Sequence, residues 1–206
     1  MRIGVLALQG AFREHVQILR DLGVEAIEVR LPEQLEGLDG LIIPGGESTT
    51  IGKLAENYGL LEPLQRFARQ RPVWGTCAGM ILMAKDIGRA QPLLALMDIE
   101  VERNAFGRQV DSFETELDIA ALDQDASVPF PAIFIRGPRL VSTDEEAGVQ
   151  VLARLEDGTA VAARQGHWLV TSFHPELSDD PRFHRYFLEM VSDPEETAPA
   201  PVAQAE

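Results

Sequence analysis

Cysteine is nearly absent from this chain of 206 residues, which contains it once, at Cys77. An intramolecular disulfide is therefore impossible, and the composition fits a reducing compartment. Long hydrophobic runs are also missing, because no apolar segment approaches the roughly 20 residues that are needed to cross a bilayer. The apolar stretch near Met1 is too short for a signal sequence and lacks a small-residue cleavage site. We therefore expect a soluble, cytoplasmic protein.

Basic residues are scarce relative to acidic ones: 18 Lys and Arg stand against 33 Asp and Glu, which gives a net charge of −15. This charge argues against nucleic acid and against anionic membranes as partners. The sequence also lacks the Gly-x-Gly-x-x-Gly dinucleotide fingerprint and the Walker A phosphate loop. No group of side chains has a convincing metal-ligand spacing. We therefore expect neither a cofactor nor a metal.

Apolar residues make up 45% of the chain, which is enough to bury one substantial core. We expect a single domain over residues 1–191. Residues 192–206 are acidic, rich in Pro and Ala, and without apolar periodicity. That composition predicts a disordered tail.

The first half of the chain alternates short apolar runs with stretches of helical periodicity. We expect strands over Ile3–Leu8, Val24–Val29, Gly40–Ile43 and Val73–Thr76. Helices are expected from Phe12 to Gly23, over Thr50–Asn57, over Leu61–Gln70 and after Cys77. Short connections between alternating strands and helices imply an α/β fold, with a mostly parallel sheet between helices on both faces.

The second half contains shorter strand candidates that are separated by turns. These are Ile99–Glu102, Ser112–Leu117, Ala132–Ile135, Val149–Leu155, Thr159–Arg164 and Trp168–Phe173. The tripeptide Glu156-Asp157-Gly158 predicts a hairpin turn between two of them. A helix over Pro181–Val191 is expected to close the domain.

Cys77 lies between two glycines, in the pattern Gly-x-Cys-x-Gly, where an expected strand meets an expected helix. This is the sulfur counterpart of the Gly-x-Ser-x-Gly elbow, a tight turn that presents a nucleophile above the sheet. Side chains at Gly75 and Gly79 would crowd such a turn. A helix start beneath the sulfur favours thiolate over thiol. The alternative is a buried structural cysteine, which is common in intracellular proteins.

A thiol nucleophile needs a base, and the base must be oriented by a third group. Among the four histidines, His174 follows an apolar strand and opens His174-Pro175-Glu176, so that Glu176 can turn back to hold the imidazole. Strand ends at the carboxyl edge of a parallel sheet gather functional groups, which favours a Cys77–His174 pair. We expect His15 and His184 to be surface or half-buried helix residues, and His167 has no obvious polar partner.

A third motif, Pro44-Gly45-Gly46-Glu47-Ser48, lies between an expected strand and an expected helix. Its glycines allow backbone N–H groups to approach a ligand, and the helix start favours negative charge. The loop is suited to form half of an oxyanion hole or to hold a phosphate, although a plain turn is an equal alternative.

These motifs together resemble class I (triad) glutamine amidotransferases, whose fold is flavodoxin-like. The resemblance is closest to the glutaminase subunits of pyridoxal 5′-phosphate synthases, and it runs from Met1 to about Val191. The motifs that carry it are GTCAG (75–79), PGGESTT (44–50), LQGAFREH (8–15), VERNAFGRQVDSF (101–113), FIR (134–136) and HPE (174–176).

The resemblance implies a role for each matching position. Cys77 is the expected nucleophile, His174 the general base and acid, and Glu176 the residue that orients it. The backbone N–H groups of Gly46 and Ala78 are expected to form the oxyanion hole. The expected glutamine-binding residues are Gly46, Glu47, Ser48, Arg103, Ile135 and Arg136. Either arginine is suited to pair with the carboxylate of the substrate.

The resemblance also implies partners. The substrate is L-glutamine, and the ammonia passes to a barrel-fold synthase subunit within a large hetero-oligomer, with no cofactor in this chain. Two other readings remain open. One is a stand-alone γ-glutamyl hydrolase or cysteine peptidase of related fold, and the other is a catalytically silent regulatory subunit.

Overall fold

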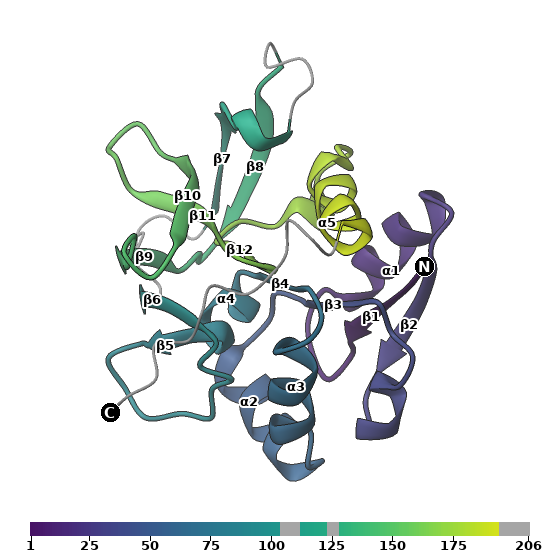
Figure 1. Cartoon of the computed structure of the whole chain (residues 1–206). Coiled ribbons are helices and arrows are strands. Elements are labelled where there is room, and N and C mark those ends of the chain that lie inside the picture. The colour runs from purple at the N-terminus through teal and green to yellow at the C-terminus, as the bar shows by residue number, and fades with distance from the viewer. Residues whose placement is uncertain (104–111, 123–127, 194–206) are drawn as a thin grey trace.

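A parallel sheet forms the centre of the computed structural model, which describes residues 1–103, 112–122 and 128–193 (Figure 1). The strands β1 (Arg2–Leu6), β2 (Glu25–Val29), β3 (Gly40–Ile43) and β4 (Val73–Thr76) lie in the order β2-β1-β3-β4. Every neighbouring pair among them is parallel. β12 (Trp168–Thr171) returns from the far end of the chain and pairs parallel with β4. The predicted parallel sheet is thus confirmed.

The strand order β2-β1-β3-β4-β12 places the site-bearing loops together. The order reverses between β1 and β3, and ligands of open α/β sheets bind beyond the carboxyl ends of the strands at such a switch point. The loops after β1, β3, β4 and β12 begin at that edge. They carry Gln9, Gly45, Cys77 and His174, respectively.

Among the described residues, the sheet continues through five further strands, most of which pair antiparallel. These are β5 (Ala84–Asp86), β6 (Met97–Glu102), β9 (Arg139–Thr143), β10 (Val149–Arg154) and β11 (Ala160–Gln165). β10 and β11 form a hairpin whose turn contains Gly158 at φ +85°, as the motif at 156–158 predicts. β7 (Ser112–Leu117) and β8 (Phe130–Ile135) form a separate two-stranded sheet (Figure 1). β5 and β9 were not predicted, because each has too few apolar residues to show a period.

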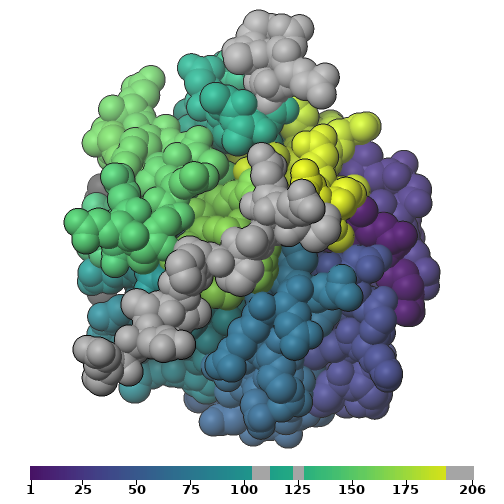
Figure 2. Space-filling view, in the orientation of Figure 1, coloured from purple at the N-terminus to yellow at the C-terminus, as the bar shows by residue number. Residues whose placement is uncertain are grey.

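Helices cover both faces of the sheet. α1 (Phe12–Asp21) and α5 (Arg182–Ser192) pack on one face, in a core cluster with Trp74. α2 (Ser48–Asn57), α3 (Leu61–Ala68) and α4 (Ala78–Met83) share residues in the core of the other face. The yellow atoms of α5 border the purple atoms of the N-terminal segment in Figure 2. The protein therefore has a mixed α/β fold, in which one sheet lies between two layers of helices.

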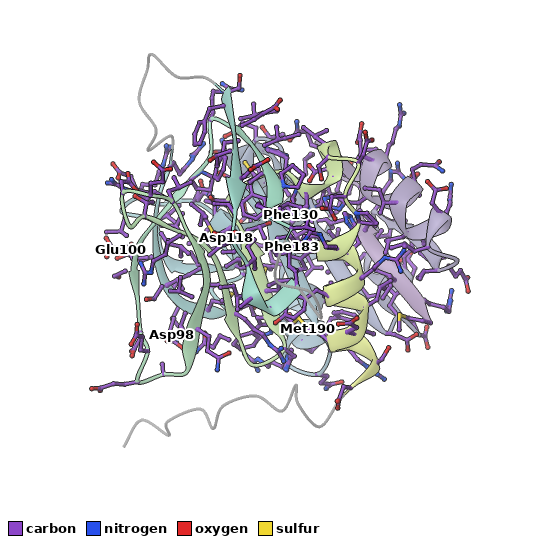
Figure 3. The ribbon with its side chains drawn as sticks, turned by 90° about the horizontal axis from the view of Figure 1, so that it is seen from above. Asp98, Glu100, Asp118, Phe130, Phe183 and Met190 are labelled. Carbon is purple, nitrogen blue, oxygen red and sulfur yellow. The ribbon has the colours of Figure 1, made fainter. Side chains whose placement is uncertain are left out.

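α5 also packs against the two-stranded sheet. Phe130 of β8 and Phe183 of α5 lie next to each other in Figure 3. Their ring centroids are 4.9 Å apart, with the rings nearly perpendicular. Such edge-to-face pairs add to the free energy gained by burying the rings. The β7–β8 sheet is therefore anchored over α5.

Three short 3₁₀ helices complete the described structure: η1 (Pro32–Leu35), η2 (Ala120–Leu122) and η3 (Pro175–Leu177). Within the described ranges, no helix has both the length and the apolar character that a membrane crossing requires. The predicted disordered tail began at Ser192, but Ser192 is the last residue of α5 (Arg182–Ser192). Residues 194–206 of that tail and residues 104–111 of the VERNAFGRQVDSF motif lie outside the described residues.

Candidate active site

Cys77 occupies a sharp turn between β4 and α4. Its backbone has φ +47°, a left-handed conformation that is uncommon for residues other than glycine. The backbone N–H of Cys77 donates to the carbonyl oxygen of Thr171 at 2.7 Å, which ties the turn to β12. A Cβ at Gly79 would collide with the backbone oxygen of Ile43, so the turn can form only with glycine there. The geometry of a nucleophile elbow is present.

His174 follows β12 and lies against a carboxylate. Its Nδ1 is 2.7 Å from Oε1 of Glu176, which lies in η3 two residues later. The backbone N–H of His174 donates to the carbonyl oxygen of Ile133 at 2.8 Å. Both side chains are buried: 7% of His174 and 5% of Glu176 is exposed. Glu176 thus holds one ring nitrogen, and the other is free to face Cys77.

The electrostatics of the site favour a charged imidazole. Burial lowers the pKa of His174, but hydrogen bonds with Cys77 and Glu176 and attraction to both groups raise it to about 10. His174 is therefore protonated near neutral pH. An imidazolium beside a cysteine is the arrangement that supplies a thiolate nucleophile.

The loop after β3 packs directly on this pair. A Cβ at Gly45 would collide with the imidazole ring of His174 and would lie 3.4 Å from Cβ of Cys77. The N–H of Gly45 donates to Oγ1 of Thr76 at 3.0 Å, and its carbonyl oxygen accepts from the N–H of Ala11 at 3.0 Å. Only glycine permits this close approach. The loop is held on one side by β4 and on the other by the loop after β1.

A pocket of about 360 Å³ opens above the cysteine and the histidine. This volume lies within the range of small-molecule sites, which begins at about 300 Å³. Its lining includes all six residues expected to bind glutamine. The lining residues are Gln9, Gly46, Glu47, Ser48, Cys77, Ile81, Arg103, Ile135, Arg136 and His174.

The two arginines of the pocket have different surroundings. Nη2 of Arg103 lies 2.8 Å from Oε1 of Glu47, and its Nη1 donates to Oγ1 of Thr49 at 3.1 Å. Arg136 has φ +46°, is exposed, and forms no ion pair with any other described residue. Arg103 therefore holds the start of α2, whereas the charge of Arg136 faces the open pocket.

Two pocket residues, Gln9 and Ile81, were among neither the expected catalytic nor the expected glutamine-binding positions. Oε1 of Gln9 accepts from the N–H of Glu47 at 2.7 Å, which joins the loops after β1 and β3. Ile81 lies four residues after Cys77 on α4, so both face the same side. That helical spacing is the signal by which Ile81 could have been found.

The expectation for two of the other histidines was wrong. His15 and His184 are completely buried, with 0% of each exposed, and not surface or half-buried residues. Nδ1 of His15 lies 2.9 Å from Nε2 of His184. His167, which had no obvious partner in the sequence, has Nε2 at 2.7 Å from the carbonyl oxygen of Ala68. Helical periodicity had marked His15 and His184 as amphipathic positions without showing which groups they face.

Comparison with known proteins places this geometry in a family. A model of the SNO glutamine amidotransferase family matches residues 5–193. The chain belongs to the SNO glutamine amidotransferase family. Relatives in this family include pyridoxal 5′-phosphate synthase subunit PdxT of Dehalococcoides mccartyi, which is 58% identical over 94% of this chain and 98% of its own. The subunit of the same name from Herpetosiphon aurantiacus is 59% identical over 91% of this chain and 99% of its own.

Solved structures agree with the assignment to this family. A crystal structure of a glutamine amidotransferase superposes with a TM-score of 0.85 at 52% identity, over 93% of this chain and 99% of that one. The PurLQS structure from Thermotoga maritima is 17% identical, with a TM-score of 0.69 over 91% of this chain and 97% of that one. The latter likeness concerns the fold alone.

Proposed function

We propose that this chain is the glutaminase subunit of a pyridoxal 5′-phosphate synthase. It hydrolyses L-glutamine to L-glutamate and ammonia, with Cys77 as nucleophile, His174 as general acid and base, and Glu176 as the group that orients His174. The observation that carries the proposal is that Cys77 and His174 line one pocket, while Nδ1 of His174 lies 2.7 Å from Oε1 of Glu176. The identities of 58% and 59% with PdxT subunits support the same activity.

The mechanism starts from the charged imidazole. The sulfur of Cys77, as thiolate, attacks the side-chain amide carbon of glutamine and forms a tetrahedral intermediate. The imidazolium of His174 donates its proton to the departing nitrogen, and ammonia leaves a glutamyl thioester. Neutral His174 then takes a proton from water, the resulting hydroxide attacks the thioester, and glutamate departs. The thiolate and the imidazolium are restored.

The oxyanion of each tetrahedral intermediate needs preorganised donors. Ala78 is the first residue of α4, so its N–H has no acceptor within the helix. Gly46 belongs to the loop that packs on the triad. We assign the oxyanion hole to the backbone N–H groups of these two residues. Removal of one such donor typically lowers the rate about 100- to 1000-fold.

Glutamine brings a carboxylate and an ammonium group into the pocket. The guanidinium of Arg136, which pairs with no other described residue, suits the carboxylate, whereas Arg103 is already bound to Glu47. We assign Arg103 to holding the loop of Gly46, Glu47 and Ser48 against the substrate. Ile135 also lines the pocket, next to Arg136 in the chain.

The partner is the synthase subunit, which we expect to have a barrel fold and to receive the ammonia within a large hetero-oligomer. Ammonia is mostly protonated in water near neutral pH, so direct transfer keeps it nucleophilic. Contact of the partner with the loops at Gln9 and Gly45, which are bound to each other, offers a route to activation. We place this reaction in the cytoplasm, where the lone cysteine stays reduced.

The decisive experiment measures ammonia release from L-glutamine by the chain together with its synthase subunit, and by the chain alone. We expect Cys77→Ala to abolish release in both cases, because no other described residue lies in the pocket as a thiol nucleophile. Equal release by the native chain and Cys77→Ala would end the assignment. Faster release from γ-glutamyl peptides than from free glutamine would favour a stand-alone hydrolase, and no release would favour a silent subunit.

A further inference from the structure

Behind the triad, on the side away from the pocket, lies a buried row of imidazoles. Oε2 of Glu176, the carboxylate oxygen that His174 does not use, is 3.4 Å from Nε2 of His15. Nδ1 of His15 is 2.9 Å from Nε2 of His184. The side chains of His15 and Glu176 are completely buried. The row therefore extends from the triad to α5 through side chains that solvent does not reach.

The hydrogen-bonding capacity of these groups selects one arrangement of protons. Only one proton can lie between the two imidazoles, so either His15 or His184 donates it. If His15 donated from Nδ1, its Nε2 lone pair would face the negative Oε2 of Glu176 inside the protein. If His184 donates, His15 carries its own proton on Nε2 and presents it to the carboxylate. Attraction to a full charge outweighs the competing hydroxyl of Thr76, which lies 3.3 Å from the same nitrogen.

The arrangement in which His184 donates to His15 also leaves no buried N–H of these two imidazoles without an acceptor. Nδ1 of His184 has no hydrogen-bond partner among the described residues. When Nε2 of His184 carries the proton, Nδ1 of His184 is an acceptor without a donor, and not a buried N–H without an acceptor. An orphaned N–H is rarer in native interiors than an orphaned acceptor. The unused nitrogen of His184 therefore agrees with the arrangement that the carboxylate requires.

We propose that His15 is a positioning residue for the glutaminase reaction, because its Nε2–H, directed by His184, holds the outer oxygen of Glu176 and thereby aims His174 at Cys77. This inference rests on the proposed triad. Without such a contact Oε2 of Glu176 would have no donor among the described residues. The carboxylate could then rotate, and the 2.7 Å contact that orients His174 would be lost for part of the time.

The contact of 3.4 Å is long for a hydrogen bond, so at rest it is an attraction between an N–H dipole and a carboxylate. Catalytic contacts often tighten only when substrate binds. Glu176 then balances the positive charge of His174 through one oxygen and receives the His15 proton on the other. His15 acts through Glu176 and touches no substrate.

A neutral His15 is required for this role, because a second cation would compete with His174 for the same carboxylate. Burial lowers the pKa of His15 well below its ordinary value, and repulsion by His184 and His174 lowers it further. Burial likewise lowers the pKa of His184 to about 3. The titratable groups that face His15 are Glu176, His174 and His184, from η3, the end of β12 and α5.

An aromatic wall keeps water from the row. The indole of Trp74 on β4 lies edge-on to both imidazoles, with ring centroids 5.6 Å from His15 and 5.0 Å from His184. Its Nε1–H donates to Oγ1 of Thr171, so the indole does not compete for either imidazole. The arrangement joins α1 and α5 to the triad through polar contacts inside an apolar core.

The test compares His15→Gln with His15→Met in the complex with the synthase subunit. The two side chains have similar length, but only glutamine can donate a hydrogen bond near the position of Nε2. We expect His15→Met to lower kcat about 10- to 100-fold, the range typical for loss of a side chain that orients a metal ligand, with KM nearly unchanged. His15→Gln should recover most of that loss. Equal kcat for His15→Met and native protein, or equal losses for both variants, would overturn the proposal.

A second readout separates positioning from mere structure. The titration of His174, followed by NMR of histidine-labelled complex, should show its pKa falling from about 10 toward 6.5 in His15→Met. The matched control is His167→Met, which removes another buried imidazole, next to the start of β12 and bound to the carbonyl oxygen of Ala68, whereas His174 follows the end of that strand. The control should lose stability without either change. An unshifted titration of His174 in His15→Met would count against the proposal.

Two further sets of variants separate a failure of the triad, or a failure to fold, from a failure of the proposed role of His15. Cys77→Ala must be inactive in the same assay, since an active variant would refute the triad itself and not the role of His15. If His15→Met does not fold, His184→Met and His184→Gln repeat the comparison one step back. Loss of kcat in His184→Met with recovery in His184→Gln supports the proposal, and native kcat in both contradicts it.

Discussion

At the scale of single residues, strain and close packing mark the site. Cys77 is held at φ +47° between β4 and α4, and its neighbours Gly75 and Gly79 leave no room for a side chain. Such conformations persist only where the surrounding structure over-determines them. The hydrogen bond from Cys77 to Thr171 and the contact of Gly45 with His174 supply that constraint. The strained backbone conformation of Cys77 is therefore part of how the turn points its sulfur into the site.

Arg136 is the residue on which recognition of the substrate carboxylate depends in our assignment. We expect Arg136→Met to raise KM for glutamine about 10- to 100-fold, because a hydrogen bond to a charged group contributes about 1.5–3 kcal/mol. The value of kcat should change little. Steady-state ammonia release in the complex measures both constants. Arg139→Met is the control, since Arg139 on β9 is bound to Glu102 on β6 and does not line the pocket. An unchanged KM in Arg136→Met would refute the assignment.

At the scale of elements, the start of α2 depends on Glu47. Its Oε1 accepts from the N–H of Thr49 at 3.3 Å, and its Oε2 accepts from the N–H of Thr50 at 2.7 Å. Burial opposes the charge of Glu47, but hydrogen bonds from Thr50 and Thr49 and attraction to Arg103 lower its pKa to about 2. A carboxylate at a helix N-terminus also interacts favourably with the helix dipole. Glu47 thus caps the helix that begins beside the pocket.

Replacement of this cap has a measurable cost. We expect Glu47→Ala to lower the free energy of unfolding by about 0.5–2 kcal/mol, the range for loss of an N-cap. Urea titration at pH 7 measures the change. Glu62→Ala is the control, because Glu62 forms its ion pair with Arg66 one turn away on the exposed face of α3, and such pairs contribute about 0.3–0.5 kcal/mol. Equal destabilisation by both variants would show that Glu47 is no cap.

The elements of the first half could be predicted almost completely. Strand and helix bounds there differ from the predicted ones by a few residues at most, because parallel strands buried on both faces read as continuous apolar runs. β5 and β9 were missed. β5 has three residues, and in β9 Leu140 is buried but the adjacent Val141 is exposed, so neither shows a detectable period. Both form as edge or link strands within a sheet that other elements define.

At the scale of the whole molecule, burial of two neutral imidazoles makes stability depend on pH. The pKa of His184 is lowered to about 3 and that of His15 lies well below its ordinary value, whereas both are near 6.5 in an unfolded chain. Below pH 6.5 the unfolded chain binds protons that the native protein does not. Unfolding free energy therefore falls as pH decreases, by up to about 1.4 kcal/mol per pH unit for each imidazole.

We expect His184→Met to reduce the number of protons taken up on unfolding by about half a proton at pH 6.5 and by almost one at pH 5, above the range in which most carboxylates titrate. His174, with its pKa of about 10, stays protonated in the native protein, so near pH 6.5 it contributes with the opposite sign until the unfolded chain has gained the same proton. This contribution is the same in native and variant chains and cancels from the difference between their slopes. Urea unfolding of native and variant chains at several pH values measures the two slopes. Identical slopes would show that His184 is already protonated in the native protein.

The sequence alone determined which residues could carry the chemistry and in what order they follow the strands. An elbow around Cys77, a His-Pro-Glu turn and a glycine loop each depend on a few neighbouring residues, and local backbone preferences encode them. Only the tertiary structure decided which of the four histidines support one another. His15 and His184 are 169 positions apart and meet because α1 and α5 pack on the same face of the sheet. Burial of a polar side chain is a property of packing between distant segments, which no local period records.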